Sequence, residues 1–477
     1  MPNRKPLSLT TDPIPSLIVR IAFPASVGFF FNTMFNVVDT YYAGRLSTDA
    51  LAALSLSFPF FMIILAVGVG VGAGTNALIS NALGAGREDE AAQYQAQAVT
   101  TALIGTFLVS VPLYFALPAL FRLFDAEGAV LAGAVGYMRV IVAGGFLIVL
   151  NNTLNAGLQA RGNTKTFRNF LLLGFLVNIG LDPLLMFGVE LRGVTLIPAM
   201  EEIGVALATI LVQGMGVFIV GRVLIKSGGL HGSTASSFYP RRQKVREILS
   251  QSLPAALNFL TIALGAFVIN YFVSRFGRDA VAAYGTALRI EQIALLPTMG
   301  VSIALAAMVG QNNGAKRLDR VAASYRTSLQ FAFLAMLLVL TPVILFAPAL
   351  LGLFTENETV ISIGKAYLYI QVLTFFSYVV MSQSNSVLQG LKRPAMIMWI
   401  GLYRQILAPF VVFPLFIGAL GLGVHGVWWG LVAVNWSAAV VTFFHTRRLL
   451  AATFRRERAE GSPAALGRMD TGEYRSP

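Results

Sequence analysis

The stretch "FFFNTMFNVVDTYYAG" at residues 29–44 holds a single carboxylate, Asp39, near the end of a mostly apolar run that begins at Leu17. The run is longer than the roughly 20 residues that a helix needs to cross the hydrocarbon core of a bilayer. An ionised carboxylate at membrane depth costs at least about 2.5 kcal/mol on insertion scales. The stretch therefore predicts a membrane-spanning helix whose carboxylate needs either a structural or a functional explanation.

The composition of the whole chain indicates the same environment. Hydrophobic residues make up 56% of the 477 residues and charged residues only 12%, and the mean hydropathy is +0.71, whereas soluble proteins carry about 25% charged residues. The apolar runs have helical length, and barrel strands would be about half as long. We therefore predict an all-α polytopic membrane protein. Its twelve expected spans are 14–42, 51–82, 95–118, 133–158, 168–188, 203–226, 246–273, 281–311, 325–348, 363–389, 397–417 and 426–446.

The positions of the basic residues predict the orientation of the spans. Most of the 35 Lys and Arg residues fall in alternate loops and in the C-terminal tail, and such a bias marks the cytoplasmic side. Both termini are therefore expected in the cytoplasm, in a multi-pass protein of the cytoplasmic (inner) membrane. The basic residues are spread over many short loops, so the net charge of +13 does not indicate a nucleic-acid partner.

An internal repeat organises the chain into two halves. Residues 230 positions apart match repeatedly, as in Tyr41 and Tyr271, Arg87 and Arg317. Because each half has an even number of spans, the two homologous six-helix bundles have the same orientation. The predicted segments are a cytoplasmic N-terminal segment at 1–13, a first lobe at 14–226, a linker at 227–245, a second lobe at 246–446 and a basic cytoplasmic tail at 447–477.

Two like-oriented bundles are typical of secondary transporters that alternate access by rocking one bundle against the other. The chain has no G-x-x-x-x-G-K-[ST] loop, so an ion gradient is the expected source of energy. An intramembrane enzyme would need a nucleophile or metal motif, and neither is found. We expect no cofactor other than a coupling ion, and a monomer with lipid around it.

One set of polar residues in the spans is present in the first half only. Asp39, Asn178 and Asp182 have the apolar counterparts Ile269, Ala408 and Val412 in the second half. The topology places both acids at a similar depth, about 8–9 Å inside the outer helix ends at 1.5 Å per residue. Asn36 and Asn178 share a helix face with the acids, and Thr209 reaches a similar depth.

This polar set suits two kinds of ion. Burial and mutual repulsion favour uptake of a proton by one of two neighbouring carboxylates, and an all-oxygen set equally suits a sodium ion. Asp39, Asn178, Asp182 and Thr209 would be the ligands if the ion is sodium. The alternative without an ion is that Asp39 pairs with Arg45 and that Asp182 only precedes a kink at Pro183.

Several motifs resemble those of the multidrug and toxic compound extrusion (MATE) transporters, and specifically the DinF-like branch. They are "FNVVDTYYAGRLSTDALAA", "NALGAGREDEA", "LQARGNTK", "NIGLDPLLMFG" and "LRIEQIALLP", over about residues 14–446. The resemblance implies two six-helix lobes and export of organic cations and amphipathic drugs in exchange for protons or sodium ions. It implies a coupling cluster of Asp39, Asn178, Asp182 and Thr209, supported by Tyr137 and Asn155, with a bend of the first helix at Pro24.

The resemblance also assigns a substrate cleft, for which we expect Asn32, Phe35, Asn36, Asn155 and Glu291. Phe35 replaces a tyrosine found in some relatives.

The seventh span has no acid and Tyr378 stands where the NorM-like branch has one, which argues against a second-lobe sodium site. Glu291 either attracts a cationic substrate or pairs locally with Arg289. A lipid-linked oligosaccharide flippase of the same superfamily is the alternative function, and it would need a cleft ringed with basic residues.

Overall fold

The computed structural model describes residues 7–191 and 193–460, and within these residues twelve helices are long and apolar enough to cross a membrane. Of the predicted terminal segments, residues 1–6 and 461–477 lie outside the described part. The first lobe contains α1 (Ile14–Leu46), α2 (Thr48–Gly84), α3 (Glu88–Arg122), α4 (Gly128–Ala160), α5 (Lys165–Met186) and α6 (Glu201–Lys226). The second contains α7 (Arg242–Val273), α8 (Arg278–Gly314), α9 (Leu318–Leu345), α11 (Glu358–Gly390), an eleventh span at Ala395–Ala419, and α14 (Val424–Glu460).

Several details differ from the expected spans. A two-stranded antiparallel hairpin, β1 (Val189–Leu191) and β2 (Val194–Ile197), follows α5 in an otherwise helical fold. A short helix α10 (Ala347–Gly352) follows α9. The eleventh span consists of α12 (Ala395–Leu402), η3 (Tyr403–Leu407), α13 (Ala408–Pro414) and η4 (Leu415–Ala419), in which η3 and η4 are π-helical. Prolines in and beside this span remove backbone donors, which favours such irregular turns.

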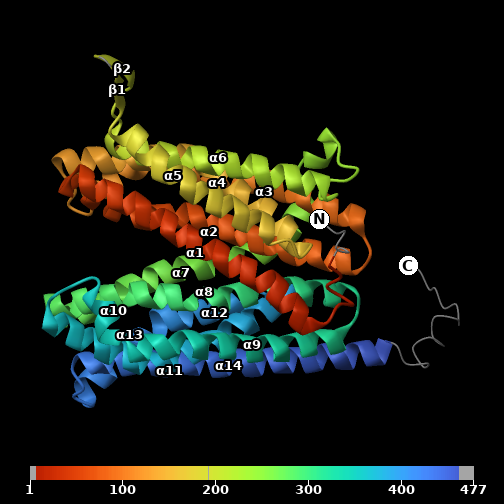
Figure 1. The fold of residues 1–477 in the computed structure, drawn as a ribbon. Coiled ribbons are helices and arrows are strands. Elements are labelled where there is room, and N and C mark those ends of the chain that lie inside the picture. Colours follow the sequence, from red (N-terminus) through yellow and green to blue (C-terminus); the bar gives the residue numbers. More distant parts are fainter. Residues whose placement is uncertain (1–6, 192, 461–477) are drawn as a thin grey trace, which may run out of the picture.

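Figure 1 shows the two lobes side by side, with β1 and β2 projecting from one end of the first lobe. The opposite end carries the start of α1 and the end of α14, and we call it the terminal face. The ribbons of the two lobes lie closest near the terminal face and diverge toward the hairpin end. Because successive helices run antiparallel, the ends of α2, α4, α8 and α11 also lie at the terminal face.

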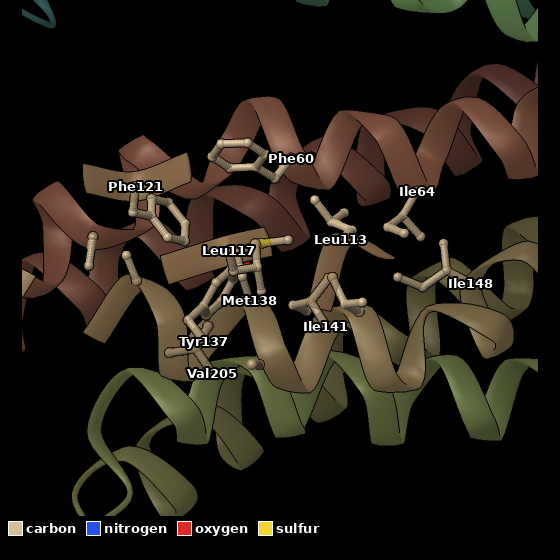
Figure 2. Close-up of a cluster of buried hydrophobic side chains, with 14 of the residues drawn as sticks. Phe60, Ile64, Leu113, Leu117, Phe121, Tyr137, Met138, Ile141, Ile148 and Val205 are labelled. Carbon is tan, nitrogen blue, oxygen red and sulfur yellow. The ribbon is translucent and has the colours of Figure 1, made fainter. Parts of the chain in front are cut away.

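Each lobe is held by its own apolar core. In the first lobe, Phe60, Phe121, Met138 and Ile141 belong to one buried cluster (Figure 2). The Phe60 and Phe121 rings meet edge to face with centroids 5.0 Å apart, a favoured geometry for aromatic pairs. The cluster joins α2, α3, α4 and α6, so the first lobe is one packed unit around its second to fourth helices.

The first helix does not pack within one lobe along its whole length. Leu17 and Ile21 in its first half are fully buried, and they belong to a second-lobe cluster that includes Val301 and Met308 of α8. Figure 1 shows this red start of α1 lying against the green and cyan helices of the second lobe. The predicted lobe at 14–226 therefore differs from the packing: the start of α1 is held by the other half of the chain.

The seventh helix repeats this exchange in the opposite direction. A Cβ added at Gly70 of α2 would lie 2.5 Å from the Ala256 Cβ of α7, and one added at Gly300 of α8 would lie 2.2 Å from the Ser26 hydroxyl of α1. Gly300 and Ala256 are the repeat counterparts of Gly70 and Ser26, each 230 residues later. Each lobe's first helix therefore crosses to the other lobe's second helix, at a glycine that lets the backbones approach.

A proline marks the crossing point in both helices, because Pro254 of α7 is the repeat counterpart of Pro24 in α1. Helix α1 continues through Pro24, although the ring removes one intrahelical donor and weakens the helix there. The buried Thr164 hydroxyl, which lies at the start of α5, donates 2.8 Å to the Ile21 carbonyl oxygen one turn before the proline. The bend position predicted at Pro24 therefore lies where α1 passes from one lobe to the other.

The linker between the lobes, expected at 227–245, ends earlier because α7 begins at Arg242. It is bound to α3: the Gln97 amide nitrogen donates 2.7 Å to the carbonyl oxygens of Ser237 and Tyr239, and its oxygen accepts 2.8 Å from the Arg241 amide. The linker is therefore anchored to the first lobe along its second half.

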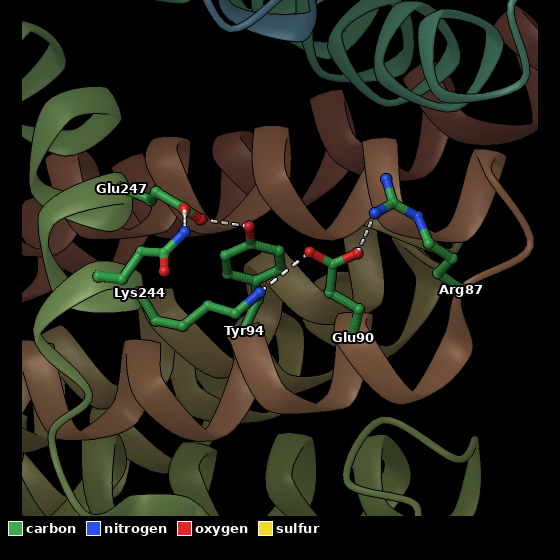
Figure 3. A network of polar contacts seen from close by, with 6 residues as sticks. Arg87, Glu90, Tyr94, Lys244 and Glu247 are labelled. Atoms are coloured by element: carbon green, nitrogen blue, oxygen red, sulfur yellow. Dashed lines mark hydrogen bonds and ion pairs between the residues drawn. The ribbon is translucent and has the colours of Figure 1, made fainter. Parts of the chain in front are cut away.

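A charged network fixes the start of α7 to α3 as well (Figure 3). The Glu90 carboxylate forms ion pairs with Lys244 at 3.0 Å and with Arg87 at 2.6 Å. The Lys244 ammonium lies 3.7 Å from the centre of the Tyr94 ring, and the Tyr94 hydroxyl donates to Glu247. The network ties the first turn of the second lobe to the first lobe at the terminal face.

The exchange of α1 between lobes can be tested by stability. Ile21→Ala removes a fully buried side chain from the second-lobe cluster and should cost about 2–5 kcal/mol because it leaves a cavity. Val19→Ala, on the exposed face of the same helix, should cost little. The measurement is the unfolding temperature of the purified protein in detergent, followed by tryptophan fluorescence. Equal decreases for the two variants would contradict the packing described here.

Candidate cation-coupling site

Two carboxylates from different helices meet at one amide in the first lobe. The Asn178 side-chain nitrogen on α5 donates 2.7 Å to Asp39 Oδ1 on α1 and 2.8 Å to Asp182 Oδ2 on α5. Asp39 is 8% exposed, and Asn178 and Asp182 are fully buried. Since ionised carboxylates only accept hydrogen bonds, the amide presents its NH2 group to both of them. One neutral side chain thus bridges two buried acids.

The helices that carry these side chains are brought together by small residues. Asn178 and Asp182 are four residues apart and so share one face of α5. A Cβ added at Gly28 of α1 would lie 3.3 Å from Leu171 Cδ1 of α5, and one added at Gly174 of α5 would lie 2.9 Å from Val212 of α6. Glycine at both positions lets α1, α5 and α6 approach closely enough for the polar side chains to meet.

The site has oxygen atoms with no hydrogen bond from the described residues. These are Asn178 Oδ1, Asp182 Oδ1 and Thr209 Oγ1, each buried. Thr209 of α6 and Tyr137 of α4 both lie within electrostatic range of Asp39. Unpartnered buried oxygens are uncommon in folded proteins, and these oxygens are free to accept a hydrogen bond or to ligate a cation. The donor set fits either a proton or a hard cation such as sodium, which prefers oxygen ligands.

The alternative pairing of Asp39 with Arg45 does not occur in the structure. The Arg45 guanidinium donates 3.3 Å to the Tyr41 hydroxyl on the exposed side of α1. Asp182 does precede a proline within a helix, because Pro183 lies inside α5, which continues to Met186, but its carboxylate also accepts 2.8 Å from Asn178. In the described part of the chain, no group of three or more Asp, Glu and His side chains could hold a metal ion.

The residues expected in the substrate cleft divide into two groups. Asn32 and Asn36 are exposed on α1 and Phe35 is half-buried, and the Asn36 amide donates 2.8 Å to the Asn32 carbonyl oxygen. Asn36 therefore does not join Asp39, although the sequence suggested a shared face. Three residues correspond to about 300° around a helix, and the buried edge of α1 ends between the two positions.

Asn155 and Glu291 are buried, 3% and 6% exposed. Asn155 lines a small pocket together with Gly28 of α1 and Ile303 of α8, whereas Glu291 lies within the second lobe. Glu291 Oε2 accepts 2.6 Å from the Tyr367 hydroxyl. The Arg289 guanidinium lies over the Phe354 ring, 5.6 Å from its centre, and it forms no ion pair with Glu291 by distance in the described chain.

The hydrogen bond between Tyr367 and Glu291 was not predicted from the sequence. Tyr367 is the repeat counterpart of Tyr137, which lies near the acids of the first lobe. The repeat therefore indicated that Tyr367, like Tyr137, would lie near a carboxylate. The identity of that carboxylate, on α8, does not follow from the 230-residue offset.

Comparisons with known proteins agree with this geometry. The MatE family model matches residues 24–184 and again residues 254–414, two segments that begin at Pro24 and Pro254 and are offset by 230 residues. The two matches together cover more than half of the chain.

The chain belongs to the MATE family. The FAD transporter of Shewanella oneidensis is 27% identical over 444 residues, covering 92% of this chain and 96% of the relative. The probable multidrug resistance protein NorM of Thermotoga maritima is 26% identical, covering 89% and 91%. A solved structure described as the outward-facing conformation of a multidrug resistance MATE family transporter superposes with a TM-score of 0.86 at 26% identity, covering 95% of this chain and all of the other.

Membership of the MATE family makes this chain a multi-pass membrane transporter and not an enzyme. The twelve-span architecture expected from the sequence is confirmed. The matched segments also reproduce the repeat, and they place the acids Asp39 and Asp182 within the first of its two units.

The restriction of the polar cluster to one lobe gives a testable asymmetry. Asp182→Leu removes a bridged carboxylate and should abolish or strongly reduce transport. Val412→Leu at the matching position of the second lobe changes only packing, at a cost of at most about 1–3 kcal/mol, and should transport nearly normally. Drug accumulation in cells would be compared at equal membrane abundance. Similar losses of transport in the two variants would show that the ion site does not lie in the first lobe alone.

Proposed function

We propose that this MATE transporter is a secondary active multidrug antiporter, which exports organic cations and amphipathic compounds in exchange for protons or sodium ions. The observation that supports coupling is the bridge between Asp39 and Asp182 through Asn178, with unpartnered oxygens around it. Two acids that share one amide repel each other when both are ionised, so uptake of a proton or a cation stabilises the cluster.

The proposed orientation puts the terminal face in the cytoplasm of a cell with this protein in its inner membrane. The predicted inside loops at the terminal face contain clusters such as Arg241, Arg242, Lys244 and Arg246, in agreement with the positive-inside bias. With this orientation the lobes are in contact on the cytoplasmic side, and the acids lie toward the outer half of the membrane. The protein would act as a monomer, because each lobe finds its partner surface within the same chain.

We infer that α1 couples the ion site to the surface that binds the substrate. Its second half carries Asp39 against α5, and its first half is packed in the second lobe. Neutralising Asp39 removes the cost of burying its charge and allows the segment after Pro24 to repack, which changes the surface that carries Asn32 and Asn36. Substrate and ion then compete through the shape of one helix, and their effects on each other's binding are reciprocal.

The flippase alternative receives less support. It needs basic side chains that are available to a phosphate group, but Arg289 lies over Phe354 and Arg404 donates 3.0 Å to Asn435 while lying over the Tyr378 ring. Arg404 is therefore engaged within the second lobe, whereas Arg289 is exposed, and two basic residues do not make the basic ring that a flippase would need. The cargo of the Shewanella relative is named as FAD, so a cargo panel should include a dinucleotide beside organic cations.

The coupling ion is tested by transport in proteoliposomes with independently imposed proton and sodium gradients. Substrate should move against its own gradient when one of the two ions is supplied on the opposite side, and stop when that gradient is collapsed by an ionophore. Uptake that follows only the substrate gradient under every condition would exclude antiport.

Asp39→Asn should abolish gradient-driven transport in this assay while the protein stays inserted and folded. The amide has nearly the same shape, but it neither exchanges a proton at physiological pH nor offers a charge to sodium. Asp49→Asn is the matched control, since Asp49 is an exposed acid at the start of α2 and its variant should keep wild-type transport. Gradient-driven transport by Asp39→Asn at the control rate would refute the role of this carboxylate.

A further inference from the structure

The closest backbone approaches between the lobes lie at the ends of α2 and α8 on the terminal face. A Cβ added at Gly84 would lie 1.9 Å from the Gln311 carbonyl oxygen, and one added at Gly314 would lie 2.0 Å from the Asn81 carbonyl oxygen. Gly314 and Gln311 are the repeat counterparts of Gly84 and Asn81. The crossing of α2 and α8 thus obeys the two-fold relation between the lobes, and it leaves no room for any side chain beyond glycine.

Two amide side chains cross this junction in matching ways. The Asn81 nitrogen on α2 donates 2.8 Å to the carbonyl oxygen of Gly390, the last residue of α11 in the second lobe. The Gln311 nitrogen on α8 donates 2.7 Å to the carbonyl oxygen of Ala160, the last residue of α4 in the first lobe. The two acceptors are again 230 residues apart. Each lobe therefore receives one hydrogen bond from the other at an equivalent place.

The chemistry of the acceptors explains why these bonds matter for closure. The last carbonyl oxygens of a helix have no partner within that helix, and they carry partial negative charge. With the lobes together, Asn81 is buried, and side-chain amides from the opposite lobe donate hydrogen bonds to these carbonyl oxygens. With the lobes apart, only water can donate to them, and a hydrogen bond within the protein is favoured over that exchange by roughly threefold to tenfold in an equilibrium constant. The bonds therefore favour the closed state without contributing to the fold of either lobe alone.

The orientation of Asn81 is fixed by a third contact across the junction. Its side-chain oxygen accepts 2.6 Å from the Asn313 amide of α8, so its nitrogen faces the Gly390 carbonyl, and it also donates 2.7 Å to the Ala77 carbonyl oxygen of its own helix. This contact has no repeat counterpart because residue 83 is a leucine.

We propose that Asn81 and Gln311 form a two-fold latch that holds the terminal face closed, and that both cross-lobe hydrogen bonds break each time the transporter opens on that side. These are positioning residues for the transport cycle, and their side-chain hydrogen bonds go to Ala77, Gly390, Asn313 and Ala160 and not to the cation cluster. The latch rests on the proposed function, taken as transport by two lobes that open alternately to the two sides of the membrane, but it is independent of the coupling ion and of the substrate.

The absence of cysteine from the chain allows a direct test by thiol labelling. Ser80→Cys provides the reporter, because Ser80 is fully buried on α2 against Gly310 of α8. A maleimide should label Cys at position 80 only when the lobes separate. The experiment uses the purified full chain without substrate or ion gradient, so its result does not depend on which cargo or ion the protein uses.

Combining Asn81→Ala with the reporter should raise the labelling rate roughly threefold to tenfold, as should Gln311→Ala, since one net hydrogen bond changes an equilibrium by about that factor. The double variant should show close to the product of the two factors if the bonds act independently. Asn81→Asp, which keeps the shape but cannot donate at neutral pH, should behave like Asn81→Ala.

Matched variants separate latch opening from damage to a lobe. Asn151→Ala removes a buried amide that bonds Gln213 at 2.8 Å inside the first lobe, and it should leave the labelling rate at position 80 unchanged. Gly84→Ala should raise that rate by steric separation of α2 and α8, whereas Gly285→Ala, whose added Cβ would meet nothing within 4 Å, should not.

A second reporter, Ser57→Cys, detects unfolding, because Ser57 is fully buried on the same helix but within the first lobe. The latch predicts faster labelling at position 80 and an unchanged rate at position 57. The proposal is overturned if the double variant labels position 80 no faster than Asn151→Ala does, or if the rates at positions 80 and 57 rise together.

Discussion

The rest of the structure depends on the crosswise packing of the first helix of each lobe. The start of α1 is buried against α8, and its second half brings Asp39 to Asn178 of α5. Because one continuous helix has its two halves in different lobes, we propose that a change in the charge of Asp39 is transmitted beyond the first lobe. Pro24 lies at the transition, where a missing backbone hydrogen bond makes repacking less costly.

The repeat supplies a symmetric scaffold, and the chemistry departs from that symmetry. Packing contacts are duplicated: Gly70 with Ala256 and Gly300 with Ser26 close the same crossing twice. The acids are not duplicated, since the second lobe has Ile269, Ala408 and Val412 at the positions of the first-lobe cluster. If the ion binds in the first lobe only, neutralising its carboxylates can move one lobe relative to the other about the symmetric helix crossing.

The sequence predicted the helices, the repeat and the meeting of Asp39 with Asp182 well, because hydropathy, a constant offset and helix rise determine them directly. It failed where the outcome depends on how helices rotate and cross. Asn36 does not share the buried face of Asp39, the start of α1 packs in the opposite lobe, and the place of Glu291, which the sequence left open, is beside Tyr367. None of these follows from spacing along one chain segment, since each is decided by the neighbour that a helix face meets.

The central claim is that neutralising Asp39 changes the relation between the lobes through α1. Spin labels on cysteines introduced at the exposed repeat-related positions Asp49 and Asp279 would report the distance between the lobes at the hairpin end by pulsed electron paramagnetic resonance. The distance distribution should shift when the pH falls from about 8 to about 5 or when sodium is added, and Asp39→Asn should show the shifted distribution under all conditions. An ion-dependent shift that persists unchanged in Asp39→Asn would contradict the account.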